Sequence, residues 1–246
     1  MLEKLKEQVY RANMSLQENN LIILTWGNVS GIDAERRYVV IKPSGVDYSE
    51  LSSNKMVVVD MDGNIVEGDL NPSSDTPTHL ELYKAFPEIG GVCHTHSLYA
   101  TSYAQQSRDI AAFGTTHADY FDGTVPCTRP MKKKEIEHEY EKNTGLVIIE
   151  RLNDLRLTPK QMPAVLVSSH GPFTWGKDAT AAAEMSLVLE NVAHLAFNTQ
   201  LLRSIISTAN KNILNNVAAA MPNELLRKHF DRKHSANAYY GQKKGE

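Results

Sequence analysis

The feature that most limits the fold of this chain is a tight-turn signal, Asp62-Gly63-Asn64. Residues 56–61, rich in valine and methionine, precede the turn, and residues 65–67 follow it. Asp-Gly between two such runs is a strong signal for a β-hairpin, whose two strands run antiparallel. The hairpin therefore argues against a sheet built only from parallel, doubly wound units.

Helix and strand patterns alternate along the rest of the chain. One helical face over residues 2–16 is formed by Leu2, Leu5, Val9, Ala12 and Leu16, and a longer face covers residues 179–203. Further helices are expected near 77–86 and 99–106, and strands at 21–25, 38–41, 91–96 and 164–169. The pattern predicts one α/β domain over residues 1–246, with a C-terminal helical tail at about 205–246.

Composition excludes several classes of protein. The chain has 246 residues, 41% hydrophobic residues and a net charge of −3, which gives no general attraction to nucleic acid or to an anionic membrane. No apolar run reaches the ~20 residues of a membrane span, and the amphipathic start lacks the core of a signal peptide. Cys93 and Cys127 are too few for a disulfide framework and are expected to be small buried residues. A cytoplasmic location follows as the expectation.

Three histidines form a candidate metal site. His94 and His96 end an apolar run, and residues i and i+2 of a strand point to the same face. His170 follows a second apolar run, and Asp75 at a helix start offers a carboxylate. Such ligands suit Zn²⁺, with Mn²⁺, Fe²⁺ or Co²⁺ as alternatives. A solvated histidine pair on an edge strand is the competing interpretation.

The other histidines are not assigned to the metal. His194 is interpreted as a core residue of the long helix, and His79 and His138 as helix-surface residues. His117, His229 and His234 stay open.

Two short segments are suited to an anion. The segment from Lys42 to Ser44 and Gly45 ends a strand with a cation, a hydroxyl and a glycine. Ser73 and Ser74 lie at a helix start, where unpaired N–H groups favour phosphate. Together with Asn28 they favour a phosphate pocket, although a plain helix cap and a plain turn are the alternatives.

Several longer runs resemble the class II aldolase/adducin family, in particular its L-ribulose-5-phosphate 4-epimerases. The runs are Leu24 to Ser30, Ile41 to Tyr48, Pro72 to His79, His94 to Ser97, Gly114 to Phe121, Ser169 to Phe173 and Ala238 to Gln242. They cover nearly the whole chain, and the part from 205 to 222 matches least.

The resemblance implies a three-layer α/β/α fold with a central mixed, largely antiparallel sheet. It also implies a homotetramer with active sites near subunit interfaces, and one Zn²⁺ per subunit. The implied roles are metal binding by Asp75, His94, His96 and His170, and substrate or phosphate binding by Asn28, Lys42, Ser44, Gly45, Ser73 and Ser74. Asp119 and Tyr240 are the implied acid/base pair, with Thr115, Glu141 and His229 as supporting residues.

The implied reaction is C4 epimerisation between L-ribulose 5-phosphate and D-xylulose 5-phosphate, as in L-arabinose or L-ascorbate-type catabolism. The C4 hydrogen is not adjacent to the carbonyl, so inversion requires cleavage of C3–C4 through an enediolate that a metal can stabilise. The family's aldolases carry glutamate where this chain has Asp75, which favours an epimerase. A sugar-phosphate aldolase, a non-catalytic, adducin-like interaction module and, less favoured, a zinc hydrolase remain alternatives. No nucleic-acid, membrane or nicotinamide partner is expected.

Overall fold

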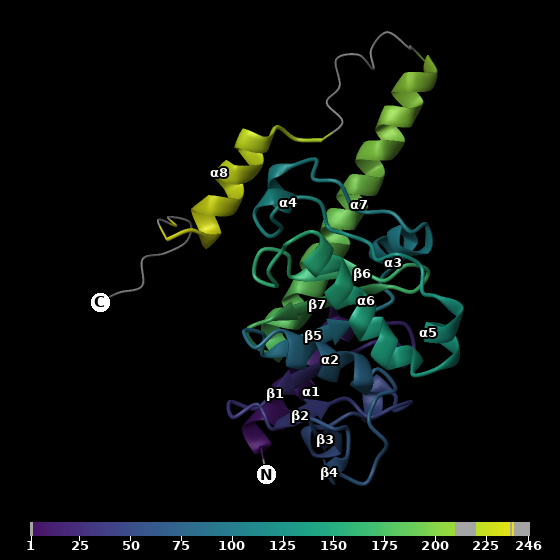
Figure 1. Cartoon of the computed structure of the whole chain (residues 1–246), viewed down its shortest axis with the longest axis vertical. Coiled ribbons are helices and arrows are strands. Elements are labelled where there is room, and N and C mark those ends of the chain that lie inside the picture. The colour runs from purple at the N-terminus through teal and green to yellow at the C-terminus, as the bar shows by residue number, and fades with distance from the viewer. Residues whose placement is uncertain (1, 210–219, 237, 239–246) are drawn as a thin grey trace.

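The computed structural model describes residues 2–209, 220–236 and 238 (Figure 1). Its strands are β1 (Asn28–Ile32), β2 (Tyr38–Ile41), β3 (Val57–Asp60), β4 (Ile65–Glu67), β5 (Gly91–His94), β6 (Ala164–Leu166) and β7 (Pro172–Gly176). Its α-helices are α1 (Glu3–Glu18), α2 (Thr76–Ala85), α3 (Leu98–Gln105), α4 (Thr115–Ala118), α5 (Lys133–Glu137), α6 (Tyr140–Asp154), α7 (Ala179–Ala209) and α8 (Asn223–His234). Two short 3₁₀ turns, η1 (Tyr48–Glu50) and η2 (Ser53–Lys55), precede β3.

The strands form one sheet in the order β4-β3-β2-β1-β5-β7-β6. Every pair of neighbouring strands is antiparallel. Among the described residues the only parallel pairing is an isolated bridge between Cys127 and Leu166. The predicted hairpin is present, and Asp60 closes its turn by accepting the N–H groups of Asp62 and Asn64, each at 2.9 Å.

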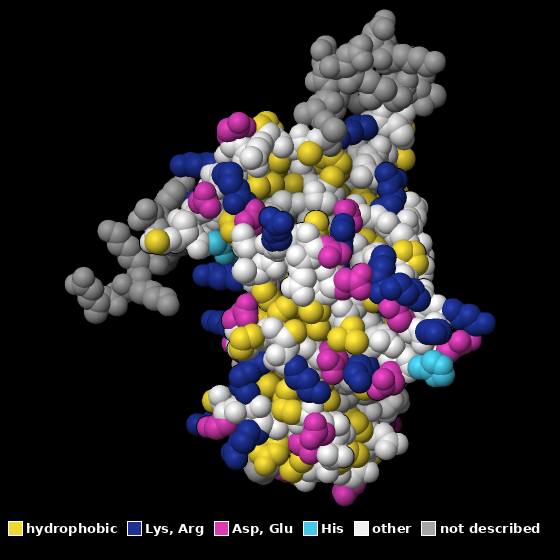
Figure 2. Space-filling model, in the orientation of Figure 1, with side chains coloured by type: hydrophobic (Ala, Val, Ile, Leu, Met, Phe, Trp, Pro, Cys, Tyr) yellow, Lys and Arg dark blue, Asp and Glu magenta, His cyan; other side chains and the backbone are white. Residues whose placement is uncertain are grey.

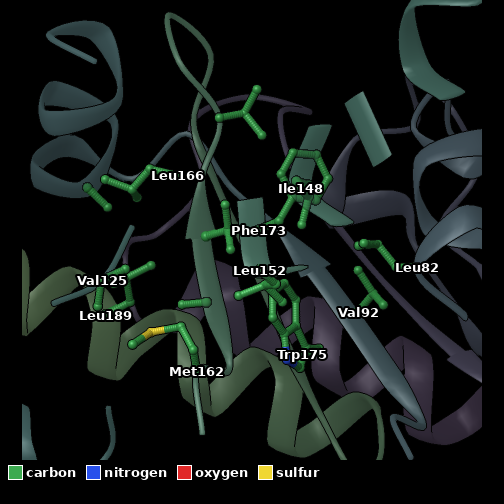
Figure 3. Packing of buried hydrophobic residues seen from close by; sticks show 14 of the residues in the cluster. Leu82, Val92, Val125, Ile148, Leu152, Met162, Leu166, Phe173, Trp175 and Leu189 are labelled. Carbon is green, nitrogen blue, oxygen red and sulfur yellow. The ribbon is translucent and has the colours of Figure 1, made fainter. Parts of the chain in front are cut away.

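Side chains alternate across the sheet into two cores. Val39, Val57 and Val59 belong to a cluster that also holds apolar residues of α2, α3, α6 and α7. Figure 3 shows members of this cluster, among them Trp175 of β7 and Leu152 of α6. Val40 and Val58 face the opposite way, toward α1 and the first turns of α7. The helices therefore cover both faces of the sheet, which confirms the predicted α/β fold (Figure 1).

The predicted strand at 21–25 is wrong. Leu21 is buried, but Ile23 and Leu24 are 61% and 71% exposed, and the segment forms turns instead. Leu24 (φ 55°) and Gly27 (φ 87°) have left-handed backbone, which an extended strand cannot contain. The first strand, β1, begins only at Asn28.

The C-terminal end of α7 and helix α8 lie apart from the sheet. In Figure 1, α7 extends beyond the sheet, and α8 lies beside α4. Figure 2 shows basic side chains gathered around α8, with acidic side chains next to them.

Both cysteines are buried and free, as predicted. None of the described helices has the length and apolar character needed to cross a bilayer.

Candidate metal centre and its cavity

A cavity of about 550 Å³ lies where several strands and helices end. Its lining comes from the loop before β1, the end of β2, the start of α2, the end of β5, the turn after β6 and the start of α6. The lining residues are Thr25, Trp26, Gly27, Asn28, Lys42, Pro43, Ser44, Gly45, Ser73, Ser74, Asp75, His94, His96, Tyr140, Glu141 and His170. All of the predicted metal and phosphate residues are therefore brought together in one place.

Sheet register determines the floor of this cavity. Asn28 of β1 is paired with His94 of β5, and His94 is paired with Phe173 of β7. The three side chains come from adjacent strands at the same level. His94 stacks on Phe173, with ring centroids 4.2 Å apart and an interplanar angle of 15°.

The three histidines converge. One ligand atom from each of His94, His96 and His170 lies within 4.8 Å of the other two. The ring centroid of His94 lies 4.8 Å from that of His96 and 4.7 Å from that of His170. The prediction that one strand carries both His94 and His96 was partly wrong, because β5 ends at His94 and His96 lies beyond the strand. Although His96 lies outside the strand, the two imidazoles still converge.

A tight turn between β6 and β7 delivers His170. The N–H of Val167 donates to the carbonyl of Gly171 at 2.9 Å, and Ser169 has left-handed backbone at φ 60°. A Cβ on Gly171 would lie 2.9 Å from the Thr95 carbonyl oxygen and 3.4 Å from Cε1 of His94. Glycine is therefore needed where this turn presses against β5.

The histidines are chemically suited to a cation. Nδ1 of His94 lies 2.9 Å from the carbonyl oxygen of Pro172, which can only accept, so Nδ1 carries the proton. The lone pair of His94 is then on Nε2. Burial, reinforced by the neighbouring imidazoles, lowers the pKa of His96 to about 4 and that of His170 to about 3. Neutral imidazoles are the form that binds a metal, so the donor set fits a divalent transition metal.

Asp75 lines the cavity but is not a member of the three-histidine cluster. Its carboxylate accepts the Asn28 amide N–H at 2.7 Å. Burial raises the pKa of Asp75, but the His94 and His79 rings and the Asn28 amide outweigh that effect, so the pKa lies below its usual value. These contacts favour the anionic form of the carboxylate.

A second group of lining residues is suited to phosphate. Lys42 is 2% exposed, donates to the Val46 carbonyl at 3.0 Å, and lies 4.9 Å from the centre of the Tyr48 ring. Burial lowers the pKa of Lys42 to about 8, against the opposing charge of Asp47. Ser73 accepts the second Asn28 N–H at 3.1 Å. A buried cation with few charged neighbours favours an anionic ligand.

Three predicted site residues lie elsewhere in the same chain. Asp119 caps α4, and Arg232 of α8 donates to its two carboxylate oxygens at 3.0 and 2.7 Å. His229 is 3.0 Å from the same carboxylate, and Lys233 is 3.8 Å away. Thr115, which begins α4, is also outside the cavity lining. Tyr240 lies outside the described residues.

Two of the remaining histidine assignments are wrong. His79 is fully buried on α2, where Nδ1 lies 2.7 Å from the Ser30 hydroxyl, which in turn is 2.8 Å from the Tyr83 hydroxyl. His194 is exposed and stacks on Tyr99, with centroids 3.8 Å apart. His138 is exposed as predicted. Trp26 and Tyr140 line the cavity although neither was assigned a role from the sequence.

Comparisons with known proteins give the family and agree with the fold. Residues 7–197 match the profile of the family described as the class II aldolase and adducin N-terminal domain. A solved L-fuculose 1-phosphate aldolase is 24% identical, with 93% of this chain and 95% of that chain covered at a TM-score of 0.71. YgbL from Klebsiella pneumoniae, titled a putative aldolase/epimerase/decarboxylase, is 22% identical, with 93% and 99% covered at a TM-score of 0.68. L-fuculose 1-phosphate aldolase from Glaciozyma antarctica PI12 is 15% identical, with 96% and 84% covered at a TM-score of 0.70.

Proposed function

Because the chain belongs to the class II aldolase and adducin family, we propose that it is a metal-dependent enzyme acting on a phosphorylated ketopentose. The proposed reaction is the C4 epimerisation that interconverts L-ribulose 5-phosphate and D-xylulose 5-phosphate. One observation carries the proposal: three histidines converge in the same cavity as a buried lysine and a serine-rich helix start. The two free, buried cysteines are compatible with the proposed cytoplasmic location.

The chemistry of the substrate demands bond cleavage. The C4 hydrogen of a 2-ketopentose is not adjacent to the carbonyl, so simple deprotonation cannot invert that carbon. Cleavage of C3–C4 can, because the fragment that keeps the carbonyl leaves as an enediolate. A Zn²⁺ ion held by His94, His96 and His170 would supply a Lewis acid for this negative charge.

The chain's own residues would hold the other fragment. Lys42, Ser44, Gly45, Ser73 and Ser74 are proposed to bind the phosphate, so that the aldehyde can rotate without leaving. Asn28 lies between the two groups, since its amide donates to Ser73 and to Asp75. It is proposed to align the carboxylate of Asp75 toward the metal.

Proton transfer is proposed to involve Asp119 and Tyr240. Asp119 does not line the cavity of its own chain, where Arg232 and His229 contact it. Its role therefore requires that a neighbouring copy place its cavity against α4, as in the expected homotetramer. Thr115 and His229 would support Asp119 there, whereas Glu141 would act from within the cavity of its own chain.

A sugar-phosphate aldolase is the second candidate. It is favoured by the overall similarity to two solved structures named L-fuculose 1-phosphate aldolase. Both candidates break a carbon–carbon bond. They differ in whether the two fragments recombine or leave.

Product analysis of the metal-loaded protein tests the proposal. We expect L-ribulose 5-phosphate to be converted into D-xylulose 5-phosphate with little free aldehyde. The His96→Ala variant is expected to lose both metal and turnover. Release of aldehyde and ketone fragments would replace the epimerase with the aldolase. A wild-type protein that binds no metal and converts nothing would support the non-catalytic interaction module.

A further inference from the structure

Tyr140 makes a contact that no sequence pattern indicated. It is the first residue of α6, and its hydroxyl lies 3.3 Å from Nδ1 of His170. The two ring centroids are 6.2 Å apart at an interplanar angle of 30°, and both side chains line the cavity. Because the hydroxyl occupies Nδ1, Nε2 is the ring nitrogen of His170 that is left for a metal.

The hydrogen bond between Tyr140 and His170 can run in either direction, because a tyrosine hydroxyl can donate or accept. If Tyr140 donates to Nδ1, the remaining proton of neutral His170 is on Nε2, which then has no lone pair for a cation. If Nδ1–H donates to Tyr140, the lone pair is on Nε2. Only the second form allows His170 to bind metal through Nε2.

His94 provides an internal comparison. Its Nδ1 faces the Pro172 carbonyl oxygen, an acceptor that permits only one tautomer. His170 faces a hydroxyl instead, so its tautomer depends on a side chain and can be changed by substitution. Outer partners of this kind commonly orient metal-binding histidines and increase their affinity for the metal.

The hydroxyl of Tyr140 is carried by a fixed part of the fold. The Thr144 hydroxyl donates to the Tyr140 carbonyl at 3.0 Å, and the Thr78 hydroxyl of α2 donates to the Glu141 carbonyl. α6 packs along α2, whose first turn follows Asp75. The start of α6 is therefore tied to the same helix that carries the proposed carboxylate ligand.

We propose that Tyr140 is a positioning residue that accepts Nδ1–H of His170 and so presents Nε2 to the metal. The inference rests on the metal binding in the proposed function, but not on which reaction the metal serves. It predicts that removing one oxygen atom from Tyr140 weakens metal binding without changing the fold.

The test compares Tyr140→Phe with Tyr103→Phe. The Tyr103 hydroxyl is buried and has no hydrogen-bond partner among the described residues, and Tyr103 does not line the cavity. Zn²⁺ affinity is measured by competition with a chelator. We expect the dissociation constant of Tyr140→Phe to rise about 10–100-fold, the usual effect of losing an outer partner, and that of Tyr103→Phe to stay at the wild-type value. Thermal unfolding of the metal-free proteins checks that both variants fold alike.

A second measurement needs no variant. ¹⁵N NMR of the Zn²⁺-loaded wild type should show His170 protonated at Nδ1. A Zn²⁺ affinity of Tyr140→Phe within twofold of wild type, or a loaded His170 without a proton on Nδ1, would overturn the proposal. Failure of the proposed function looks different, because the wild type and His96→Ala would then bind Zn²⁺ equally weakly.

Discussion

The cavity around His94 and the contact between α4 and α8 hold the two halves of the predicted site, and they differ in charge balance. In the cavity, the buried Lys42 ammonium donates to the Pro43 and Val46 carbonyls and forms no salt bridge among the described residues. At the α4–α8 contact, Asp119 already faces Arg232, His229 and Lys233. The first region is prepared for a ligand, whereas the second has its charges compensated by its own chain.

The difference shows which part of the site one chain completes by itself. Strand ends and helix starts fix the cavity residues, which all come from the first 170 positions. Asp119 is instead engaged by a helix that follows a segment outside the described residues. Four experiments can separate the two regions.

Substitution of His170 by alanine should give the largest effect and should be confined to the cavity. We expect bound metal to fall to background and kcat/KM to fall by at least about 10⁴-fold, the several kcal/mol that a Lewis acid contributes. Metal analysis and steady-state kinetics measure this. Helix α8 should keep its protection from hydrogen exchange, and loss of that protection would show that the two regions are one unit.

Asp119→Asn should give the complementary result. Metal content should stay at the wild-type level, while kcat falls by about 10²–10³-fold if Asp119 serves as an acid/base. Loss of its charged hydrogen bonds should lower the free energy of unfolding by about 1–3 kcal/mol. Asp69→Asn, on an exposed carboxylate, is the matched control. Unchanged kcat would restrict Asp119 to holding α8.

Lys42 allows the cavity to be tested by pH. Its pKa of about 8 means that it is charged below pH 8 and loses its proton as the pH rises further. Phosphate binding should therefore weaken above pH 8, with KM rising toward about tenfold per pH unit for one ionisation. Kinetics of Lys42→Met should show a raised KM that no longer depends on pH in this range. A pH-independent KM in the wild type would exclude Lys42 as the phosphate cation.

At the α4–α8 contact, a fall in pH, and not a rise, should weaken the interaction. The effect should be smaller than the one expected for Lys42. Burial raises the pKa of Asp119, but Arg232 and His229 outweigh it and hold the pKa below the usual carboxyl value. Its contribution is then fully present above the ordinary pKa of Asp and is lost as the pH falls through the lower folded-state value. The difference in unfolding free energy between wild type and Asp119→Asn should shrink as the pH falls below about 4, the ordinary pKa of Asp, as measured by urea titration. A constant difference would contradict the ion pair.

Sequence patterns predicted the cavity well because its residues are tied to local signals. The Asp62-Gly63 turn predicted the antiparallel pairing, and the apolar run before His94 predicted β5. The failed strand at 21–25 shows the limit of that reasoning. Ile23 and Leu24 are exposed there, and the left-handed backbone of Leu24 and Gly27 turns the chain before β1.

Contacts between different helices and strands determined the remaining positions. A pattern within one helix or strand does not reveal such contacts. His79 is buried between α2 and the sheet, where the Ser30 hydroxyl of β1 contacts its ring. His194 is exposed and stacks on the Tyr99 ring at the surface. Tyr140 reaches His170 only through the packing of α6 on α2. Each of these contacts joins residues more than 25 positions apart, which periodicity within one helix or strand does not detect.

The ring of His94 is confined on several sides, by the face of Phe173, the carbonyl of Pro172 and the backbone of Gly171. Its rotational freedom is therefore lost when the sheet forms, and not when an ion arrives. Small zinc-dependent domains, in contrast, order their ligands and their fold in the same step. In this protein a chelator should strip the ion and leave the ligand arrangement intact, so one folded scaffold can exchange one divalent metal for another.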